Sequence, residues 1–217
     1  MTKVIRIDFV SDVSCPWCAV GLAALEKALE TLSGEVTANI TFQPFELNPS
    51  MPEQGQDIVE HLQQKYGSDE QQQAQTRQMI CERGRSLGFE FNPAGRGRIW
   101  NTFDAHRLLY MADREGQTGQ QIALKKALLA ACHTRSEAMG SHDVLLGCAL
   151  ESGLNKSRVQ EVLASDLFTN DVRDRQQYYL SQGISGVPAV IFNQSLLVSG
   201  AQPVEIFEQA LTQTDAL

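Results

Sequence analysis

Two neighbouring stretches decide the fold of this chain: Val4-Ile5-Arg6-Ile7-Asp8-Phe9-Val10 and, four residues later, Cys15-Pro16-Trp17-Cys18. The first stretch is rich in β-branched residues and predicts a strand. After the cysteines, apolar residues such as Leu22, Leu25 and Leu32 recur at helical spacing and predict a helix. The cysteine pair is therefore expected at a strand-to-helix junction, at the start of the helix.

The position of the cysteine pair favours redox chemistry. Two thiols three positions apart can close an intramolecular disulfide and open it again. At a helix start, unpaired backbone N–H groups and the positive end of the helix dipole stabilise a thiolate, which is the nucleophile in disulfide exchange. We therefore expect Cys15 to be the nucleophile, with a pKa below that of a free cysteine. Cys18, one turn further in, is expected to resolve the mixed disulfide.

Half of a zinc site is the alternative interpretation of the pair. Structural zinc takes four ligands, usually from two such pairs. Cys81, Cys132 and Cys148 form no second pair, and no histidine has matching spacing. The spacing therefore favours a redox pair without a metal, and the three other cysteines are expected to be buried small apolar residues.

Length and composition limit the remaining function classes. A chain of 217 residues can bury a large core, as one domain or as one domain with an insertion. Its net charge of −8 argues against binding to nucleic acid or to an anionic membrane surface. No apolar stretch has the length of a signal peptide or a membrane span, so we expect a cytoplasmic protein.

Beyond the first helix, the pattern changes from β to helical and back to β. Val36–Phe45 predicts a second strand, which completes a βαβ unit with parallel strands. From about residue 57 to 183 the pattern is helical, without a convincing strand. Residues 188–192 and 196–198 then predict a hairpin, and Pro203 suits the first position of a closing helix. The order βαβ…ββα indicates an α/β fold with a large all-helical insertion.

Helix-capping residues mark several boundaries within the helical block. Ser68-Asp69-Glu70-Gln71 is typical of a capping box. Thr102 and Ser141 are expected to begin two further helices, and Gly153 to end one.

This order of elements, with the cysteine pair after the first strand, resembles the thioredoxin-like fold with a helical insertion. More specifically, the chain resembles the DsbA-like oxidoreductases of the FrnE-like subgroup over nearly its whole length. The resemblance implies a discontinuous thioredoxin-like domain of residues 1–50 and 184–217, and a helical insertion domain of residues 51–183. The motifs that carry it are Asp8–Asp12, Cys15–Cys18, Phe45–Pro49, Asn101–Thr102 with Ala105–Leu108, Gly183–Pro188 and Val198–Pro203.

The resemblance also implies residues that contact the substrate. In that family the proline matching Pro188 is cis and lies against the cysteine pair, and the backbone of the preceding residue, here Val187, pairs with the bound substrate. Pro16 fixes the first helical turn, where its missing N–H costs little, and is expected to border the substrate. Trp17 either gives the site an apolar surface or packs against the insertion.

Asp8 and His106 could each have either a chemical role or a structural role. Asp8 could accept the Cys18 proton, as a buried acid does in related thioredoxin-fold enzymes, although it lies one residue further from the first cysteine. Its alternative role is that of a salt-bridged strand residue. His106 could tune Cys15 by adding positive charge to the cleft, but a helical histidine is more often a structural hydrogen-bonding residue.

The sequence thus predicts a thiol–disulfide oxidoreductase, a reductase or isomerase acting on disulfide-containing proteins or small thiols. We expect no cofactor beyond the Cys15–Cys18 disulfide, with glutathione as a candidate co-substrate. The net direction depends on the stability of the two redox forms and on the compartment. The alternatives are a peptide-binding chaperone and a glutathione-dependent transferase or isomerase of the kappa or hydroxychromene carboxylate isomerase type. Those transferases and isomerases typically carry serine at the position of Cys15 and lack the second cysteine.

Overall fold

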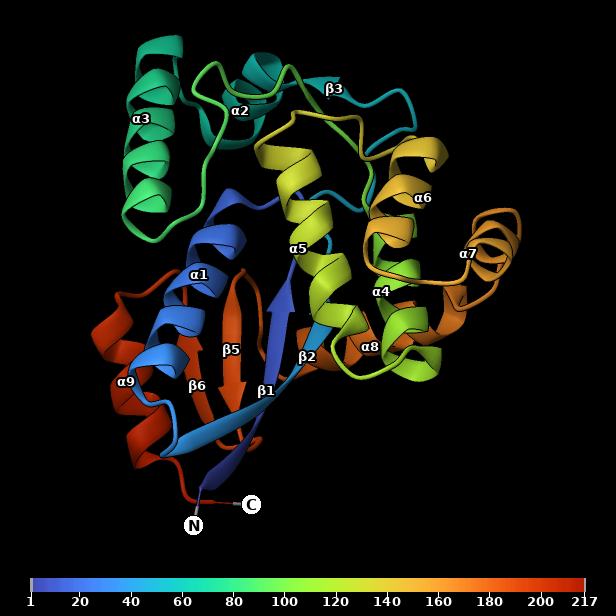
Figure 1. Ribbon diagram of the computed structural model, residues 1–217. Coiled ribbons are helices and arrows are strands. Elements are labelled where there is room, and N and C mark those ends of the chain that lie inside the picture. The colour runs from blue at the N-terminus through green and yellow to red at the C-terminus, as the bar shows by residue number, and fades with distance from the viewer. Residues whose placement is uncertain (1, 217) are drawn as a thin grey trace.

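The sheet of the molecule is built outward from β1. Strand β1 pairs in parallel with β2 and antiparallel with β5, which pairs antiparallel with β6, in the order β2-β1-β5-β6 (Figure 1). The structure, a computed structural model, describes residues 2–216. The strands of this sheet are β1 (Lys3–Ser11), β2 (Val36–Pro44), β5 (Ala189–Phe192) and β6 (Leu196–Ser199).

Helices occupy most of the chain between β2 and β5, as the sequence predicts (Figure 1). None of the helices in residues 2–216 is long and apolar enough to span a bilayer. The order β1-α1-β2, helical block, β5-β6-α9 confirms the predicted α/β class. The helices are α1 (Pro16–Thr31), α2 (Ile58–Tyr66), α3 (Glu70–Ser86), α4 (Phe103–Glu115), α5 (Gln120–His133), α6 (His142–Glu151), α7 (Lys156–Leu163), α8 (Thr169–Ser181) and α9 (Val204–Gln213).

The two faces of β1 have different neighbours because side chains alternate along a strand. Ile5, Ile7 and Phe9 are fully buried in a core that they share with α1 and α9. Val10 points to the other face and packs with Tyr179 of α8. Since the end of β1 is held from both faces, the turn that carries the cysteine pair starts from a fixed position.

Two hydrophobic cores meet near that turn. One lies between the sheet, α1 and α9, and the other lies among the helices α4 to α7. Leu129 of α5 belongs to the sheet core, whereas Val13 of the β1–α1 turn belongs to the helical core. The division of the chain into a domain of residues 1–50 and 184–217 and an insertion of residues 51–183 stays a prediction. Val13 and Leu129 each pack into the core of the other part.

A short strand pair within the helical block corrects the expectation of helices alone. β3 (Gln56–Asp57) pairs antiparallel with β4 (Arg98–Ile99). Two residues are too few for the alternating pattern that predicts a strand. Gly55 lies beside this pair with φ +65°, and a Cβ there would lie 2.4 Å from the Ile99 carbonyl oxygen. The close approach therefore requires glycine at this position.

The helix caps differ in detail from the sequence prediction. Asp69, rather than Ser68, caps α3, because its carboxylate accepts from the Gln72 N–H while the Gln72 side chain accepts from the Asp69 N–H. Pro203 precedes α9 as its N-cap instead of occupying its first turn. Thr102 and Ser141 begin α4 and α6 as expected, without side-chain capping bonds.

Candidate active site

The first turn of α1 holds the cysteine pair at the end of the sheet. Cys15 is the N-cap residue, with extended backbone angles, and Pro16 follows as the first helical residue. Proline suits this position because the N–H that it lacks would have no partner within the helix. The Cys15 N–H donates to the Asp12 carbonyl at 3.3 Å, and the Cys18 N–H donates to the Cys15 carbonyl at 3.1 Å. The turn therefore places both thiols on the same side of the helix start.

The two thiols have opposite pKa shifts. A hydrogen bond from the Cys18 side chain is the main cause that holds the pKa of Cys15 below its ordinary value, and the backbone N–H groups of Cys18 and Trp17 add to it. These donors outweigh burial and the nearby Asp12 charge, which raise the pKa of Cys15. Burial raises the pKa of Cys18 well above its ordinary value. The pair thus combines an ionisable thiol at the helix start with a protonated thiol behind it.

Cys15, the expected nucleophile, is almost completely buried. Its residue surface is 4% exposed, whereas Cys18 is fully buried. Both are free thiols in this structure. Cys15 nevertheless lines a cleft of about 430 Å³, and Cys18 does not. The cleft therefore gives access to Cys15 and not to Cys18.

The loop before β5 lies against the cysteine pair. The Val187–Pro188 peptide bond is cis, as the resemblance implies. The Cys15 thiol donates to the Val187 carbonyl oxygen over 3.6 Å, and Val187 also lines the cleft. Pro188 packs beneath α1, where a Cβ at Gly21 would lie 3.0 Å from the Pro188 Cγ. Glycine at position 21 therefore permits the close approach of α1 to this loop.

We name two parts of the cleft lining as walls. The lining outside these two walls consists of Asn48, Ser68, Phe91, Asn92, Gly95, Arg96, Ile99 and His133. The sheet wall consists of Ser14–Trp17, Leu47 and Val187, and the helix wall consists of the residues of α2 and α3 that line the cleft. Apolar side chains face the cleft from both walls. The lining residues of the helix wall are Ile58, Val59, His61, Leu62, Tyr66, Gln73, Thr76, Arg77, Ile80 and Cys81.

Trp17 lies both at the cleft and beside the insertion. It lines the cleft with Cys15, and its ring also packs against the insertion. The Arg83 guanidinium of α3 lies 5.9 Å from the centre of that ring and donates to the Ala201 carbonyl. The two interpretations of Trp17 therefore do not exclude each other.

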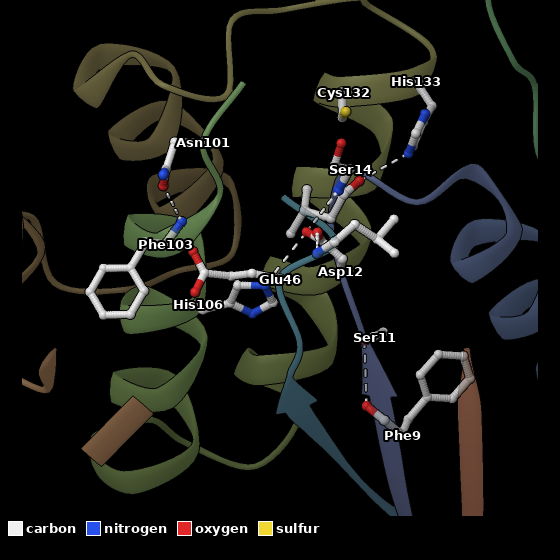
Figure 2. Close-up of polar contacts among 12 residues, drawn as sticks. Phe9, Ser11, Asp12, Ser14, Glu46, Asn101, Phe103, His106, Cys132 and His133 are labelled. Atoms are coloured by element: carbon white, nitrogen blue, oxygen red, sulfur yellow. Dashed lines mark hydrogen bonds and ion pairs between the residues drawn. The ribbon is translucent and has the colours of Figure 1, made fainter. Parts of the chain in front are cut away.

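Asp12 is a site residue to which the sequence analysis gave no role. Its carboxylate accepts from the Ser14 N–H at 3.1 Å and from the Leu47 N–H at 2.7 Å, and it lies 3.5 Å from Nε2 of His106 (Figure 2). Burial raises the pKa of Asp12, but His106 and the two N–H groups outweigh burial and lower the pKa to about 2. Asp12 thus fixes the turn before Cys15 as a carboxylate. An aspartate two residues before a serine is a signal for such a turn.

His106 and Glu46 lie behind Asp12 rather than in the cleft (Figure 2). His106 is buried, and its ring faces the Asp12 carboxylate. Glu46 forms an ion pair with Arg173, whose guanidinium lies 3.8 Å from the centre of the Phe103 ring. The position of His106 agrees with the structural role that the sequence favours for it.

Asp8 lies outside the cleft as well. The Arg6 guanidinium lies 3.2 Å from one carboxylate oxygen of Asp8, and Gln43 Nε2 donates to the other at 2.8 Å. These contacts match the salt-bridged strand residue that the sequence analysis offered as the alternative to a proton acceptor.

Helix α5 contributes one buried residue that sequence reasoning missed, Lys125, and one that it expected to be buried, Cys132. Lys125 is fully buried. Because lysine is usually a surface residue, the amino-acid sequence does not indicate that this side chain is buried. Cys132 is buried as predicted, and Arg96 Nη1 donates to its sulfur at 2.9 Å. Cys148 is also buried, but the prediction is wrong for Cys81, which is half-buried and lines the cleft.

Residues 2–216 contain no group of three or more histidine, cysteine, aspartate or glutamate side chains arranged to hold an ion.

Comparison with known proteins gives one family and several similar structures. The family model described as DSBA-like thioredoxin domain matches residues 6–212. A probable DsbA oxidoreductase from Streptomyces coelicolor is 31% identical, with a TM-score of 0.88 over 96% of this chain and 89% of that chain.

Two further solved structures share the fold at lower identity. A 2-hydroxychromene-2-carboxylate isomerase is 13% identical, with a TM-score of 0.67 over 96% of this chain and 95% of that chain. The cytosolic disulfide reductase DsbM from Pseudomonas aeruginosa, solved with GSH, is 14% identical, with a TM-score of 0.63 over 96% and 98% of the two chains.

Proposed function

The chain belongs to the DSBA-like thioredoxin domain family, and from this premise we propose that it is a thiol–disulfide oxidoreductase that uses Cys15 and Cys18. The observation that carries the proposal is the pair of opposite pKa shifts within one helical turn, with the lowered pKa on the thiol that lines the cleft. The FrnE-like subgroup stays a prediction.

The proposed reaction has two exchange steps. The Cys15 thiolate attacks one sulfur of a substrate disulfide, and the other substrate sulfur leaves as a thiolate. Cys18 then loses its proton and attacks the Cys15 sulfur, and the second substrate thiolate leaves. The substrate gains two electrons, and the enzyme is left with a Cys15–Cys18 disulfide that an external dithiol or two monothiols must reduce.

The cleft supports a substrate that is small or extended. Its volume of about 430 Å³ falls in the range of about 300–1,000 Å³ that is usual for small-molecule sites. We propose disulfides of small thiols, with glutathione as co-substrate, and narrow segments of disulfide-containing proteins. For an extended segment, Val187 is the proposed contact, since its carbonyl lies beside the Cys15 thiol.

Net reduction in the cytoplasm is the proposed direction and location. The five cysteines are odd in number and unevenly spaced along the chain, which makes a poor framework of structural disulfides. In a reducing compartment a close cysteine pair is more often catalytic than structural.

A glutathione-dependent isomerase or transferase is the rival function, because the 2-hydroxychromene-2-carboxylate isomerase has a similar fold. Such an enzyme needs one activated group that holds the co-substrate, whereas an oxidoreductase needs both thiols. Retention of Cys18, buried one turn behind Cys15, therefore favours the oxidoreductase.

The Cys18→Ser variant separates the two functions. The proposed reductase loses its turnover of glutathione disulfide or insulin by about 100-fold or more and accumulates a mixed disulfide on Cys15, which mass spectrometry detects. A transferase or isomerase keeps its turnover within about twofold and accumulates no adduct, because its reaction does not pass through Cys18. The double variant Cys15→Ala/Cys18→Ala is the control for a chaperone, which would still suppress aggregation.

A further inference from the structure

We infer that Lys125 takes up the proton that Cys18 releases when it resolves the mixed disulfide. This inference rests on the proposed function, because it assigns a role within the second exchange step. The evidence for it is the burial of Lys125, its lack of a partner and the groups that surround it.

Neither a hydrogen bond nor an ion pair within the described residues explains the burial of Lys125. Its side chain is fully buried, and its Nζ has no hydrogen-bond or ion-pair partner in residues 2–216. A buried lysine without a partner is costly, and an apolar side chain of the same length would fill the space without that cost. The neighbouring Lys126 shows the ordinary arrangement, since it is 57% exposed and bonds to Glu26 at 2.9 Å.

The surroundings of Lys125 contain the reacting thiols. Helix α5 packs against β2, and Nζ lies 5.6 Å from the centre of the Phe42 ring (Figure 1). The ionisable groups that interact with the Lys125 charge are Cys18 and Cys15 from α1, Asp12 from the β1–α1 turn, and Cys132 and His133 from α5 itself. Cys18 has the strongest favourable interaction among them.

The other groups near the pair are already engaged. The Asp12 carboxylate accepts two backbone N–H groups and faces His106, and its low pKa makes it a weak base. Cys132 receives a hydrogen bond from Arg96. Asp8, the acid that the sequence offered for this role, is bound by Arg6 and Gln43.

Burial shifts the pKa values of Lys125 and Cys18 in opposite directions, towards each other. Burial lowers the pKa of Lys125, which favours its neutral amine, and burial raises the pKa of Cys18, which favours its protonated thiol. Proton transfer from Cys18 to Lys125 creates an ammonium and a thiolate that attract each other, which lowers the cost of forming the attacking thiolate.

The step balances in atoms and electrons. The Cys18 proton moves to the Lys125 amine, the Cys18 thiolate attacks the Cys15 sulfur, and the bond between Cys15 and the substrate breaks. The departing substrate thiolate carries away the electron pair of that bond. It takes a proton from solvent, or the proton held on Lys125, which restores the neutral amine.

Dithiobis(nitrobenzoate) separates the two steps in one experiment on the reduced protein. Attack by Cys15 releases the first thionitrobenzoate anion, and resolution by Cys18 releases the second. We expect Lys125→Met to slow the second release at least about tenfold at neutral pH and to change the first less than about threefold. The matched control, Lys126→Met, changes neither release.

The pH dependence distinguishes proton transfer from a structural role. In Lys125→Met the rate of the second release rises about tenfold per pH unit, because it follows the fraction of Cys18 thiolate in solution equilibrium. In the wild-type protein the rate rises less steeply. A second release in Lys125→Met with the wild-type rate and the wild-type pH profile overturns the inference.

Two further outcomes keep the inference separate from the proposed function. A wild-type protein that releases only one thionitrobenzoate contradicts the redox pair itself, whatever Lys125 does. If Lys125→Met does not fold, carbon NMR of the lysine Cε in the wild-type protein replaces it. We expect one lysine whose titration midpoint changes between the dithiol and disulfide forms. Midpoints for all lysines at their ordinary value of 10.5 in both forms overturn the inference.

Discussion

The two walls of the cleft differ in how firmly the rest of the molecule holds them. The sheet wall starts from β1, which is buried on both faces, and buried hydrogen bonds of Asp12 fix its turn. The helix wall is carried by α2 and α3, and the buried residues of α3 are Gln73, Ile80 and Gly84, out of seventeen. Regions with few buried contacts open at lower free energy than core elements do.

The firmly held sheet wall and the less buried helix wall suit two different tasks within one cleft. The proposed exchange reaction needs the thiols, the helix start and Val187 at fixed positions, and the buried contacts of the sheet wall favour this. Recognition of substrates of different size would be served better by a wall that adjusts, and the few buried residues of α3 favour the helix wall for that task. Changes on the sheet wall should therefore affect the chemistry, and changes on the helix wall should affect affinity.

The largest expected effect comes from exchanging sulfur for oxygen on each wall. Cys15→Ser on the sheet wall should lower disulfide turnover by about 10³-fold or more, because a serine hydroxyl does not ionise at neutral pH. Cys81→Ser on the helix wall, which lines the same cleft, should change turnover less than about twofold. Steady-state reduction of glutathione disulfide measures both. Equal losses in the two variants would remove the distinction between the walls.

Asp12→Asn should change stability and thiol acidity in opposite directions. The pKa of Asp12, about 2 against an ordinary 3.8, corresponds to about 2 kcal/mol of stability at neutral pH. This contribution is present above about pH 4 and is lost as the pH falls towards 2, because the folded state binds the proton more weakly.

Urea unfolding should therefore show Asp12→Asn to be less stable by about 2 kcal/mol at pH 7 and similar to the wild type near pH 2. Removal of the Asp12 charge should also lower the pKa of Cys15, which that charge raises. A stability difference that is the same at all pH values would contradict the role of this carboxylate.

A smaller effect is expected from apolar residues of the helix wall. Ile80→Ala should raise KM for a bulky disulfide by about tenfold and leave kcat nearly unchanged, because the substrate loses apolar contact before and during the reaction alike. Met79→Ala is the matched control, since Met79 is exposed and does not line the cleft. A fall in kcat without a change in KM would assign Ile80 to the chemistry.

The smallest effect concerns the contact between the walls. Arg83→Met removes the guanidinium from the Trp17 ring and from the Ala201 carbonyl. We expect a loss of about 1 kcal/mol. Amide hydrogen exchange should become faster in α3 and stay unchanged in β1. Faster exchange in both elements would show that the two walls open together.

The features of this molecule that the sequence predicts correctly are those that depend on residues close together in the chain. The cysteine pair at a helix start, the βαβ unit and the β5–β6 hairpin each follow from residues close together in the chain. The contacts of Asp12 with His106 and the burial of Lys125 depend on α4 and α5 packing against the sheet. Such contacts join residues about 100 positions apart, and no local pattern records them. Cys81 was misjudged because the exposure of a helical residue depends on which of its faces meets a neighbour.

Titration of the reduced protein measures whether Cys15 is held as a thiolate at the start of α1. The ultraviolet absorbance of thiolate, followed against pH in the wild type and in Cys18→Ser, reports the pKa of Cys15. We expect a wild-type midpoint below the value of about 8.5 for a free cysteine, and a higher midpoint in Cys18→Ser, because the variant loses the Cys18 thiol as a donor. A wild-type midpoint at or above about 8.5 would contradict this expectation.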